Sequence, residues 1–258
     1  MFHLAAINGT GNFYKIPVKI MDVGVIGCFN VLKYVKEYSV AKTVMASSAE
    51  VYQDCSIIPT PEDVPLIIPD VKNPRFSYGL SKIYTEYYSY QFGVEEGLNI
   101  SIFRPHNVFG PNMGLQHVIP QFLMEFITQF KKGTEVVVNA KGSLDAIRAF
   151  CYVDDIVNGI KVLAQHNKGV NVYNLGNKQK ISMLDLVEEI AVIMDCKYKI
   201  VQAANEHIGG TMLRCPDISK AEKLGFSCTT SLTDGLRATA NWYIDNEKIL
   251  REVTNPSY

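Results

Sequence analysis

The stretch YGLSKIYTEYYSYQFGVEEGLNISIF, residues 78–103, decides the fold class because a helix pattern runs directly into a strand pattern. We predict a helix over residues 78–96, ended by Gly97, since glycine commonly follows the last helical turn. The run NISIF at residues 99–103 then predicts a buried strand. A helix that leads within a few residues into a buried strand is the repeating unit of α/β folds.

Two more strand patterns lie upstream of this helix. Residues 1–6 (MFHLAA) and 42–47 (KTVMAS) are apolar runs of strand length, and residues 17–38 between them carry apolar side chains at helical spacing. The order strand, helix, strand, helix, strand predicts an α/β fold with a partial doubly wound, Rossmann-like parallel sheet.

Residues 53–75 contain five prolines and are predicted to form a loop. After residue 110 the alternation of strands and helices becomes less regular. Further helices are predicted at 117–132, 153–165, 182–194 and 231–245, and further strands at 135–138, 171–175 and 198–202. We therefore expect a sheet domain at residues 1–110 and a smaller α/β substrate-binding lobe at 111–258, part of which returns to the sheet.

Composition excludes several classes of protein. The net charge is −1 with both signs intermixed, and Lys131-Lys132 is the only adjacent basic pair, so a nucleic-acid-binding surface is not expected. No apolar run reaches membrane-spanning length, and we expect no membrane association. The six cysteines form no C-x-x-C pair, which predicts reduced thiols in a cytoplasmic protein and no metal site.

Tyr78 and Lys82 stand one helical turn apart, so both side chains project from the same face of the predicted helix. A free tyrosine has a pKa near 10, but a nearby ammonium and a cationic nicotinamide ring make the phenolate accessible. Tyr78 could then take a proton from a substrate hydroxyl while hydride leaves the same carbon. The alternative is a helix in which the Tyr-x-x-x-Lys spacing is incidental.

Polar residues also follow two of the predicted strands. Ser47 and Ser48 end one strand, where parallel sheets bind ligands, and a serine hydroxyl there could share the substrate proton with Tyr78. Asn107 lies in a Pro- and Gly-rich loop after another strand and offers an amide donor for a phosphate oxygen. The alternatives are an ordinary serine turn and a tight domain crossover.

Several motifs together resemble the extended short-chain dehydrogenase/reductase family, specifically its NAD-dependent nucleotide-sugar epimerases, dehydratases and decarboxylases. The matching pieces occur in family order across essentially the whole chain: HLAA (3–6), SSAEVY (47–52), Tyr78-x-x-x-Lys82, RPHNVFGP (104–111), RAFCYVDD (148–155), YNLG (173–176) and RCPDISK (214–220).

The resemblance implies a role for each matching residue. Tyr78 would be the general base, Lys82 would tune it and contact the cofactor ribose, and Ser48 would position the 4-hydroxyl of the sugar. NAD would be lined by residues of the strand ends and the active-site helix, namely Leu4, Ala5, Ala6, Ser47, Tyr78, Lys82, Pro105 and His106. The nucleotide-diphosphate sugar would be held by Asn107, Val118, Arg148 and Arg214.

Glu50 bears on which reaction follows the shared 4-keto intermediate. The Ser-x-Glu pattern resembles dehydratases and decarboxylases, and RCPDIS resembles UDP-glucuronate decarboxylases, yet many epimerases also carry Glu at this place. Ala49 stands where 4,6-dehydratases have a second acidic residue. An epimerase is the simplest expectation, with a decarboxylase or a dehydratase as alternatives. The structural alternative for Glu50 is a carboxylate that forms an ion pair or faces solvent.

Two departures from the family pattern favour a further alternative. The glycine-rich turn that grips the dinucleotide is not found: Gly9-Thr10-Gly11 is the best candidate, but Tyr14 holds the place of the third glycine. Gly24 stands where the family usually has an asparagine. We therefore expect a truncated cofactor domain, and the alternative to an enzyme is a non-catalytic nucleotide-binding or structural homologue.

Family members usually dimerise, so a homodimer through helices 17–38 and 78–96 is also expected.

Overall fold

The computed structural model describes residues 1–53, 55–130, 135–140, 142–166, 168–202 and 211–247. These residues form two compact units. The first unit comprises Met1–Val108, Ala149–Lys180 and Leu213–Thr229, and the second comprises Phe109–Arg148, Ile181–Met212 and the described part of Thr230–Tyr258. The first unit thus includes two segments that lie after the expected boundary at residue 110.

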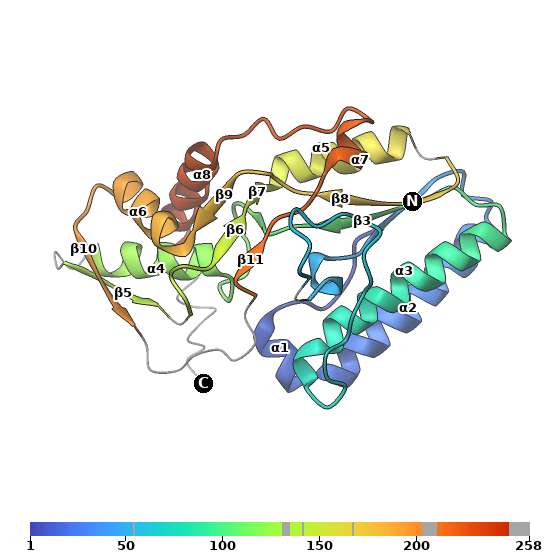
Figure 1. Ribbon diagram of the computed structural model, residues 1–258, viewed down its shortest axis with the longest axis horizontal. Coiled ribbons are helices and arrows are strands. Elements are labelled where there is room, and N and C mark those ends of the chain that lie inside the picture. The colour runs from blue at the N-terminus through green and yellow to red at the C-terminus, as the bar shows by residue number, and fades with distance from the viewer. Residues whose placement is uncertain (54, 131–134, 141, 167, 203–210, 248–258) are drawn as a thin grey trace. The chain divides into compact units, whose positions relative to one another are not determined.

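A four-stranded parallel sheet forms the centre of the first unit (Figure 1). Its strands in spatial order are β1 (Phe2–His3), β2 (Thr43–Ala46), β3 (Ile100–Pro105) and β8 (Val170–Leu175). The register pairs Val44 with Ser101, and Ile102 with Val172. The predicted α/β fold with a parallel sheet is therefore confirmed.

The first strand is shorter than the sequence predicts. Of residues 1–6 only Phe2–His3 pair with β2, and the next residues, Leu4 to Ala6, are exposed. Among the described strands, β1 is paired with β2 on one side only. The apolar character of residues 4–6 is therefore not enough to extend the strand.

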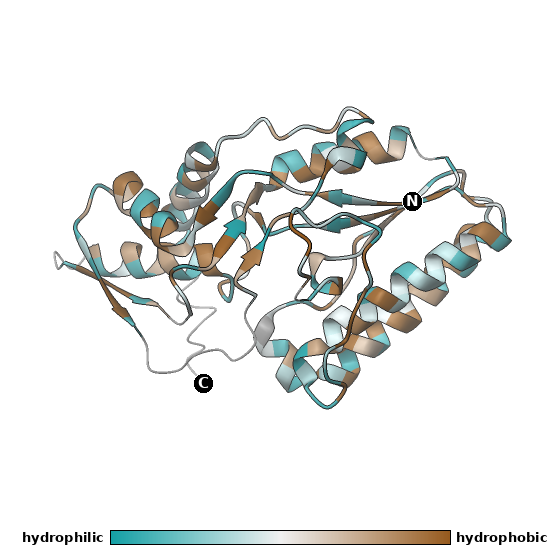
Figure 2. Ribbon diagram, in the orientation of Figure 1, coloured by the Kyte–Doolittle hydropathy of each residue, from teal (hydrophilic) through white to brown (hydrophobic). Residues whose placement is uncertain are grey.

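Helices cover both faces of this sheet, as expected where side chains alternate between two buried faces. Met45 and Ile102 face α2 (Pro17–Glu37) and α3 (Ser77–Glu95), while Val44 and Phe103 face α5 (Val153–Gln165). Figure 2 shows hydrophobic and hydrophilic residues interspersed along these helices, consistent with one apolar stripe each. The predicted helices 17–38, 78–96 and 153–165 correspond closely to α2, α3 and α5.

Short elements of the first unit were not predicted, because two to six residues carry too little periodicity. They are α1 (Thr10–Lys15), η1 (Ala49–Val51), η2 (Pro74–Phe76), β7 (Cys151–Tyr152), β11 (Leu213–Arg214) and α7 (Ser219–Glu222). The helix α1 begins directly after Gly9, the first residue of the best candidate for the glycine-rich turn. Three further strands, β4 (Val108–Phe109), β6 (Ile147–Ala149) and β9 (Lys180–Ser182), include residues at the unit boundaries.

The second unit contains three helices and a parallel strand pair among its described residues. The helices are α4 (Val118–Phe130), α6 (Met183–Met194) and α8 (Leu232–Asp245), and β5 (Val136–Ala140) pairs with β10 (Tyr198–Gln202). The end of the predicted helix 117–132, with Lys131-Lys132, lies outside the described residues. Within the described ranges no helix is long and apolar enough to cross a membrane.

Candidate functional site

The structure brings Tyr78, Ser48 and Lys82 together at the ends of parallel strands. Tyr78 lies in the first turn of α3, and the Ser48 side chain acts on its hydroxyl so as to lower the pKa of Tyr78. Lys82 follows one turn later; its Nζ donates a 2.7 Å hydrogen bond to the carbonyl oxygen of Ala46 at the end of β2 and lies 5.7 Å from the centroid of the Tyr78 ring. Ser48 is fixed in turn, because its Oγ accepts a 3.2 Å hydrogen bond from the backbone N–H of Glu50.

Burial dominates the proton affinities of this group. Desolvation above all, with the Ser48 side chain acting in the opposite direction and the Glu50 charge in the same one, raises the pKa of Tyr78 to about 12. Burial also lowers the pKa of Lys82 to about 8, against the opposing influence of Cys28 and Glu86. Tyr78 therefore holds its proton at neutral pH in this structure, and the expectation that an ammonium and a cationic nicotinamide ring together make the phenolate accessible stays a prediction.

The segment after β1 borders the same region. Phe13 of α1 stacks on the Tyr78 ring, with centroids 5.3 Å apart and planes 10° from parallel. Burial, followed by the charge of Lys82, lowers the pKa of His3, so the end of β1 lies within the electrostatic reach of Lys82. Leu4, 53% exposed, follows His3 directly and leaves apolar surface open to solvent there.

These residues fit the reactive end of a nicotinamide cofactor. A tyrosine, a serine and a lysine offer the hydroxyl and ammonium groups that can contact a ribose and a reacting carbonyl, and the exposed Leu4 offers an apolar surface for a flat ring. For the pyrophosphate, Gly9 has a φ of 107° and precedes α1, but α1 has only six residues. We assign no phosphate site to α1.

Glu50 and Arg214 form an ion pair, although the sequence suggested different tasks for them. The Nη1 of Arg214 lies 2.6 Å from Oε1 of Glu50, and Nη2 of Arg75 lies 4.0 Å from Oε2. The two paired side chains are 13% and 26% exposed, so the pair is partly shielded from water. The arrangement matches the ion-pair alternative for Glu50 and places the expected phosphate ligand Arg214 against a carboxylate.

Side chains of the loop after β3 form hydrogen bonds with other segments of the first unit. The Asn107 amide donates to the carbonyl oxygen of Ala149 at 3.0 Å, and Asn107 has a φ of 40°. His106 is fully buried, its Nε2 lies 3.1 Å from Oδ1 of Asn174, and burial lowers its pKa to about 3. Pro105, the last residue of β3, is half-buried. Contacts of these residues with a ligand remain predictions.

Two expected substrate ligands belong to the second unit. Arg148 donates hydrogen bonds to the carbonyl oxygens of Thr211 at 2.5 Å and of Met212 at 3.3 Å. Val118 is the first residue of α4 and is half-buried. Their contacts with a nucleotide also remain predictions.

A buried network beneath the site was missed by the sequence analysis. The guanidinium of Arg104 binds the Glu86 carboxylate twice, at 2.8 Å through Nε and 2.5 Å through Nη2. Ser47 donates its hydroxyl hydrogen to the same carboxylate, which explains why Ser47 itself is buried. Arg104 also donates to the Tyr52 hydroxyl at 2.6 Å, and Tyr52 donates to Asn174 at 2.7 Å.

A signal for this network was present in the sequence. Glu86 follows Lys82 by one helical turn on the helix face that must pack on the sheet, and Arg104 lies in an otherwise apolar strand. Charged residues are rarely buried unless they are paired, so one acid and one base in buried elements predict each other. The network links the end of β2 to the residues around His106.

Gly24 has a packing role where the family usually has asparagine. A Cβ built on Gly24 of α2 would lie 2.8 Å from Cβ of Ser81 and 3.0 Å from its Oγ on α3. Real Cβ atoms essentially never approach so closely, so a larger side chain would force the two helices apart. The glycine thus allows close packing of α2 against the helix that carries Tyr78.

Comparisons with known proteins place these features in a family. The profile of the NAD dependent epimerase/dehydratase family matches residues 1–176. UDP-glucuronic acid decarboxylase 1 of Xenopus tropicalis is 30% identical over 259 residues, which cover 100% of this chain and 59% of that protein. UDP-glucuronate 4-epimerase of Thermodesulfobacterium geofontis is 29% identical and is matched over 98% of this chain and 75% of its own length.

The fold agrees with these relatives. The crystal structure of UDP-glucose 4-epimerase from Thermotoga maritima, with UDP-glucose, superposes with a TM-score of 0.82 and 26% identity, covering 96% of this chain and 77% of that one. The chain described here spans less than two thirds of the length of the first of these curated relatives.

Proposed function

Because the chain belongs to the NAD-dependent epimerase/dehydratase family, we propose that it acts on nucleotide-diphosphate sugars through a 4-keto intermediate, most simply as a 4-epimerase. The observation that carries the proposal is the grouping of Tyr78 with Lys82, whose Nζ lies 5.7 Å from the centroid of the Tyr78 ring, and with Ser48, whose side chain lowers the pKa of Tyr78. Residues with incidental spacing on a solvent-facing helix would not be buried together at the carboxyl ends of parallel strands.

In this proposal Tyr78 exchanges a proton with the sugar hydroxyl. The Ser48 hydroxyl positions the sugar hydroxyl next to the Tyr78 hydroxyl. Lowering the pKa of Tyr78 from about 12 to about 7 requires on the order of 7 kcal/mol of added stabilisation of the phenolate. One unit charge about 4 Å away supplies only about 4 kcal/mol near a protein surface. Lys82 is therefore insufficient alone, and the tyrosine becomes a base only beside a second positive charge.

A bound oxidised nicotinamide ring would carry that second charge. NAD would be held by the residues that the family resemblance assigns, with the exposed Leu4, Ala5 and Ala6 against the cofactor and Lys82 near its ribose. When bound, NAD supplies the chemistry of accepting a hydride and returning it. The protein residues orient the sugar, hold the proton at Tyr78 and keep water from the buried hydroxyl pair.

Decarboxylation of a UDP-glucuronate-type sugar is a second candidate, supported by a specific contact. Glu50 and Arg214 are paired at 2.6 Å, and they belong to the SSAE and RCPDIS runs that resemble decarboxylases. Relatives with that printed activity are 30% identical over nearly the whole chain. A paired carboxylate and guanidinium close to Tyr78 could position a charged sugar.

One assay separates these reactions. The purified chain is incubated with NAD and either UDP-glucose or UDP-glucuronate, and products are followed by proton NMR. A 4-epimer supports the leading proposal, whereas loss of the C6 carbon as carbon dioxide identifies a decarboxylase. Absence of both products, together with binding of UDP but not of NAD, would favour a non-catalytic nucleotide-binding homologue instead.

The non-catalytic alternative has its own structural support. Phe13 stacks directly on Tyr78, and the pKa of Tyr78 is raised rather than lowered. A stacked ring and a raised pKa both favour a Tyr78 that keeps its proton and does not react. Binding of UDP and of NAD, measured separately by calorimetry, distinguishes this alternative from an enzyme that is active when the cofactor is present.

We also propose a homodimer through α2 and α3. Each helix keeps large apolar residues exposed after packing on the sheet: Val18 (71%), Ile26 (54%), Phe29 (46%), Tyr87 (68%) and Val94 (59%). Light scattering should give twice the 28.8 kDa chain mass. Ile26→Asp should reduce it to the monomer mass, and a monomeric wild-type chain would refute the proposal.

A further inference from the structure

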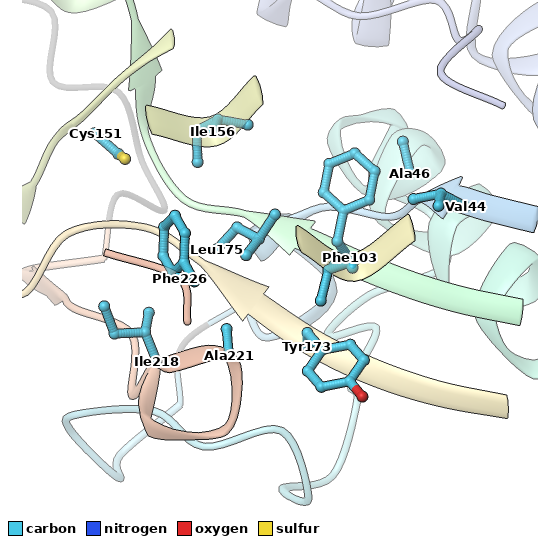
Figure 3. Close-up of a cluster of buried hydrophobic side chains, with 11 residues drawn as sticks. Val44, Ala46, Phe103, Cys151, Ile156, Tyr173, Leu175, Ile218, Ala221 and Phe226 are labelled. Atoms are coloured by element: carbon cyan, nitrogen blue, oxygen red, sulfur yellow. The ribbon is translucent and has the colours of Figure 1, made fainter. Parts of the chain in front are cut away.

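Two cysteines that are far apart in the sequence meet in the first unit. Cys151 of β7 and Cys228, which follows α7, place their sulfur atoms 3.6 Å apart. Cys151 is fully buried at one end of a hydrophobic cluster (Figure 3), whereas Cys228 is half-buried. Both are free thiols in the structure. None of the chemistry proposed above uses this pair.

We propose that Cys228 and Cys151 are an oxidative modification site, in which a peroxide oxidises Cys228 and Cys151 then closes an intramolecular disulfide. Redox-sensitive cysteines are typically accessible and stand beside a second cysteine that resolves the first oxidation product. The unequal exposure of the two thiols gives each one a role: Cys228 meets the oxidant, and Cys151 is protected from it. This inference does not depend on the proposed enzymatic activity.

The distance and the local backbone favour bond formation. A disulfide has an S–S length of about 2.05 Å, so the sulfur atoms need to approach by about 1.5 Å. Cys228 lies in an irregular segment between α7 and α8, so its side chain turns by breaking the 3.1 Å hydrogen bond that its Sγ donates to the carbonyl oxygen of Gly176 and no hydrogen bond of a helix or strand. Cys151 is held in place by its backbone N–H, which donates to the carbonyl oxygen of Asn107 at 3.2 Å.

The hydrogen bond between the thiols makes them chemically unequal. Either thiol can donate this hydrogen bond; when Cys151 donates, the pKa of Cys228 is lowered, and the same interaction together with burial raises the pKa of Cys151. The nearby carboxylates of Asp155 and Glu222 oppose the thiolate, while Lys178 favours it. The thiolate is the reactive form of cysteine, so the more accessible sulfur is also the better nucleophile.

The reaction balances with hydrogen peroxide as the oxidant. The Cys228 thiolate attacks one peroxide oxygen, the O–O bond breaks, and Cys228 sulfenic acid and hydroxide form. The Cys151 sulfur then attacks the Cys228 sulfur, the S–O bond breaks, and the oxygen leaves as water with the Cys151 proton. In sum, two thiols lose two electrons and two protons, and one peroxide becomes two water molecules.

A neighbouring carboxylate requires one control. An oxygen of Asp155 and the two sulfur atoms all lie within 4.8 Å of one another, and Asp155 is oriented by Thr229, whose N–H and hydroxyl both donate to it at 3.0 Å. Three such ligands are fewer than the four of a structural zinc site, but thiolates bind soft cations. The oxidation is therefore carried out with a chelator present, so that no bound cation blocks Cys228.

The test treats the reduced, desalted chain with hydrogen peroxide and maps its cysteines by mass spectrometry under denaturing conditions. We expect the peptides of Cys151 and Cys228 to be joined, with the loss of two hydrogen atoms. Cys228 should react about tenfold faster than Cys196, a half-buried thiol elsewhere in the chain. Cys151→Ser should leave Cys228 as a sulfenic acid that a cyclic 1,3-dione captures.

The matched variants decide the outcome. Cys228→Ser should abolish the joined peptide, and Cys196→Ser should leave it unchanged. Over-oxidation of Cys228 without a disulfide in the wild-type chain would overturn the proposal. So would a pair that stays reduced while Cys196 is oxidised.

Discussion

The guanidinium of Arg214 lies 2.6 Å from the carboxylate of Glu50, although these residues are separated by 163 intervening positions. The ion pair joins the turn after β2 to the strand β11 within the first unit. If Arg214 holds the diphosphate of a substrate, as the family resemblance implies, that diphosphate must compete with Glu50 for the same guanidinium.

This competition predicts opposite effects of two substitutions on UDP affinity. Glu50→Gln should tighten binding by up to about tenfold, because removing the carboxylate charge releases Arg214 for phosphate oxygens. Arg214→Ala should weaken binding. Calorimetric titration with UDP measures both, and Glu222→Gln, which alters the exposed Lys178–Glu222 pair, is the control. Unchanged affinity in Glu50→Gln would contradict the competition.

The buried His106 should make folding stability depend on acid pH. Its folded pKa is lowered to about 3 by burial, with Arg214 and Arg104 acting in the same direction, while an unfolded histidine titrates near 6.5. The unfolded chain therefore binds more protons between these values, and stability falls as pH drops from about 6.5 towards 3. At pH 5 the loss is about 2 kcal/mol from this residue.

Urea unfolding at several pH values measures the slope for His106. His106→Gln should flatten it, and His166→Gln, at an exposed position, should not. An NMR titration in which the His106 ring protonates near pH 6.5 in the folded chain would contradict the account, whether or not the variant folds.

The Arg104–Glu86 pair should be costly to break. Its side chains are 4% and 5% exposed, and removing one partner leaves a buried charge without compensation. Glu86→Gln should lower the free energy of unfolding by roughly 3–5 kcal/mol. Glu96→Gln, in the more exposed pair with Lys36, should cost at most about 1 kcal/mol. Equal losses for the two variants in denaturant unfolding would be inconsistent with this role.

Two glycines of α2 provide a matched test of the helix packing. Gly24→Ala places a methyl group against Ser81 and should destabilise the chain by about 1–3 kcal/mol. Gly27→Ala meets no atom within 4 Å and should stabilise it by up to about 1 kcal/mol through helix propensity. Thermal unfolding should therefore shift in opposite directions, and a shared direction would count against close packing at Gly24.

The sequence predicted the large elements because their patterns are long. The helices 17–38, 78–96 and 153–165 and the strands 99–103 and 171–175 were found within two residues of their expected ends. The helix α1 was not predicted, since its six residues include Gly11 and end two positions before Pro17, which gives no helical period. Short elements depend on tertiary contacts, such as that of Phe13 with Tyr78.

The candidate site was predicted less completely than the fold. Spacing on one helix indicated Tyr78 and Lys82, and the strand end indicated Ser48. Sequence could not show that burial raises the pKa of Tyr78, because desolvation depends on neighbours brought from elsewhere in the chain. The same holds for the Glu50–Arg214 pair, whose partners are distant in sequence.

The most direct test of the central proposal is the turnover rate of Tyr78→Phe on UDP-sugars with NAD present. Phenylalanine keeps the ring and its stacking on Phe13 but removes the hydroxyl to which the proposal assigns the proton exchange. We expect kcat to fall by at least about a hundredfold with little change in KM. Tyr87→Phe, at a 68% exposed position of the same helix, should retain the wild-type rate. A wild-type rate in Tyr78→Phe would contradict the account.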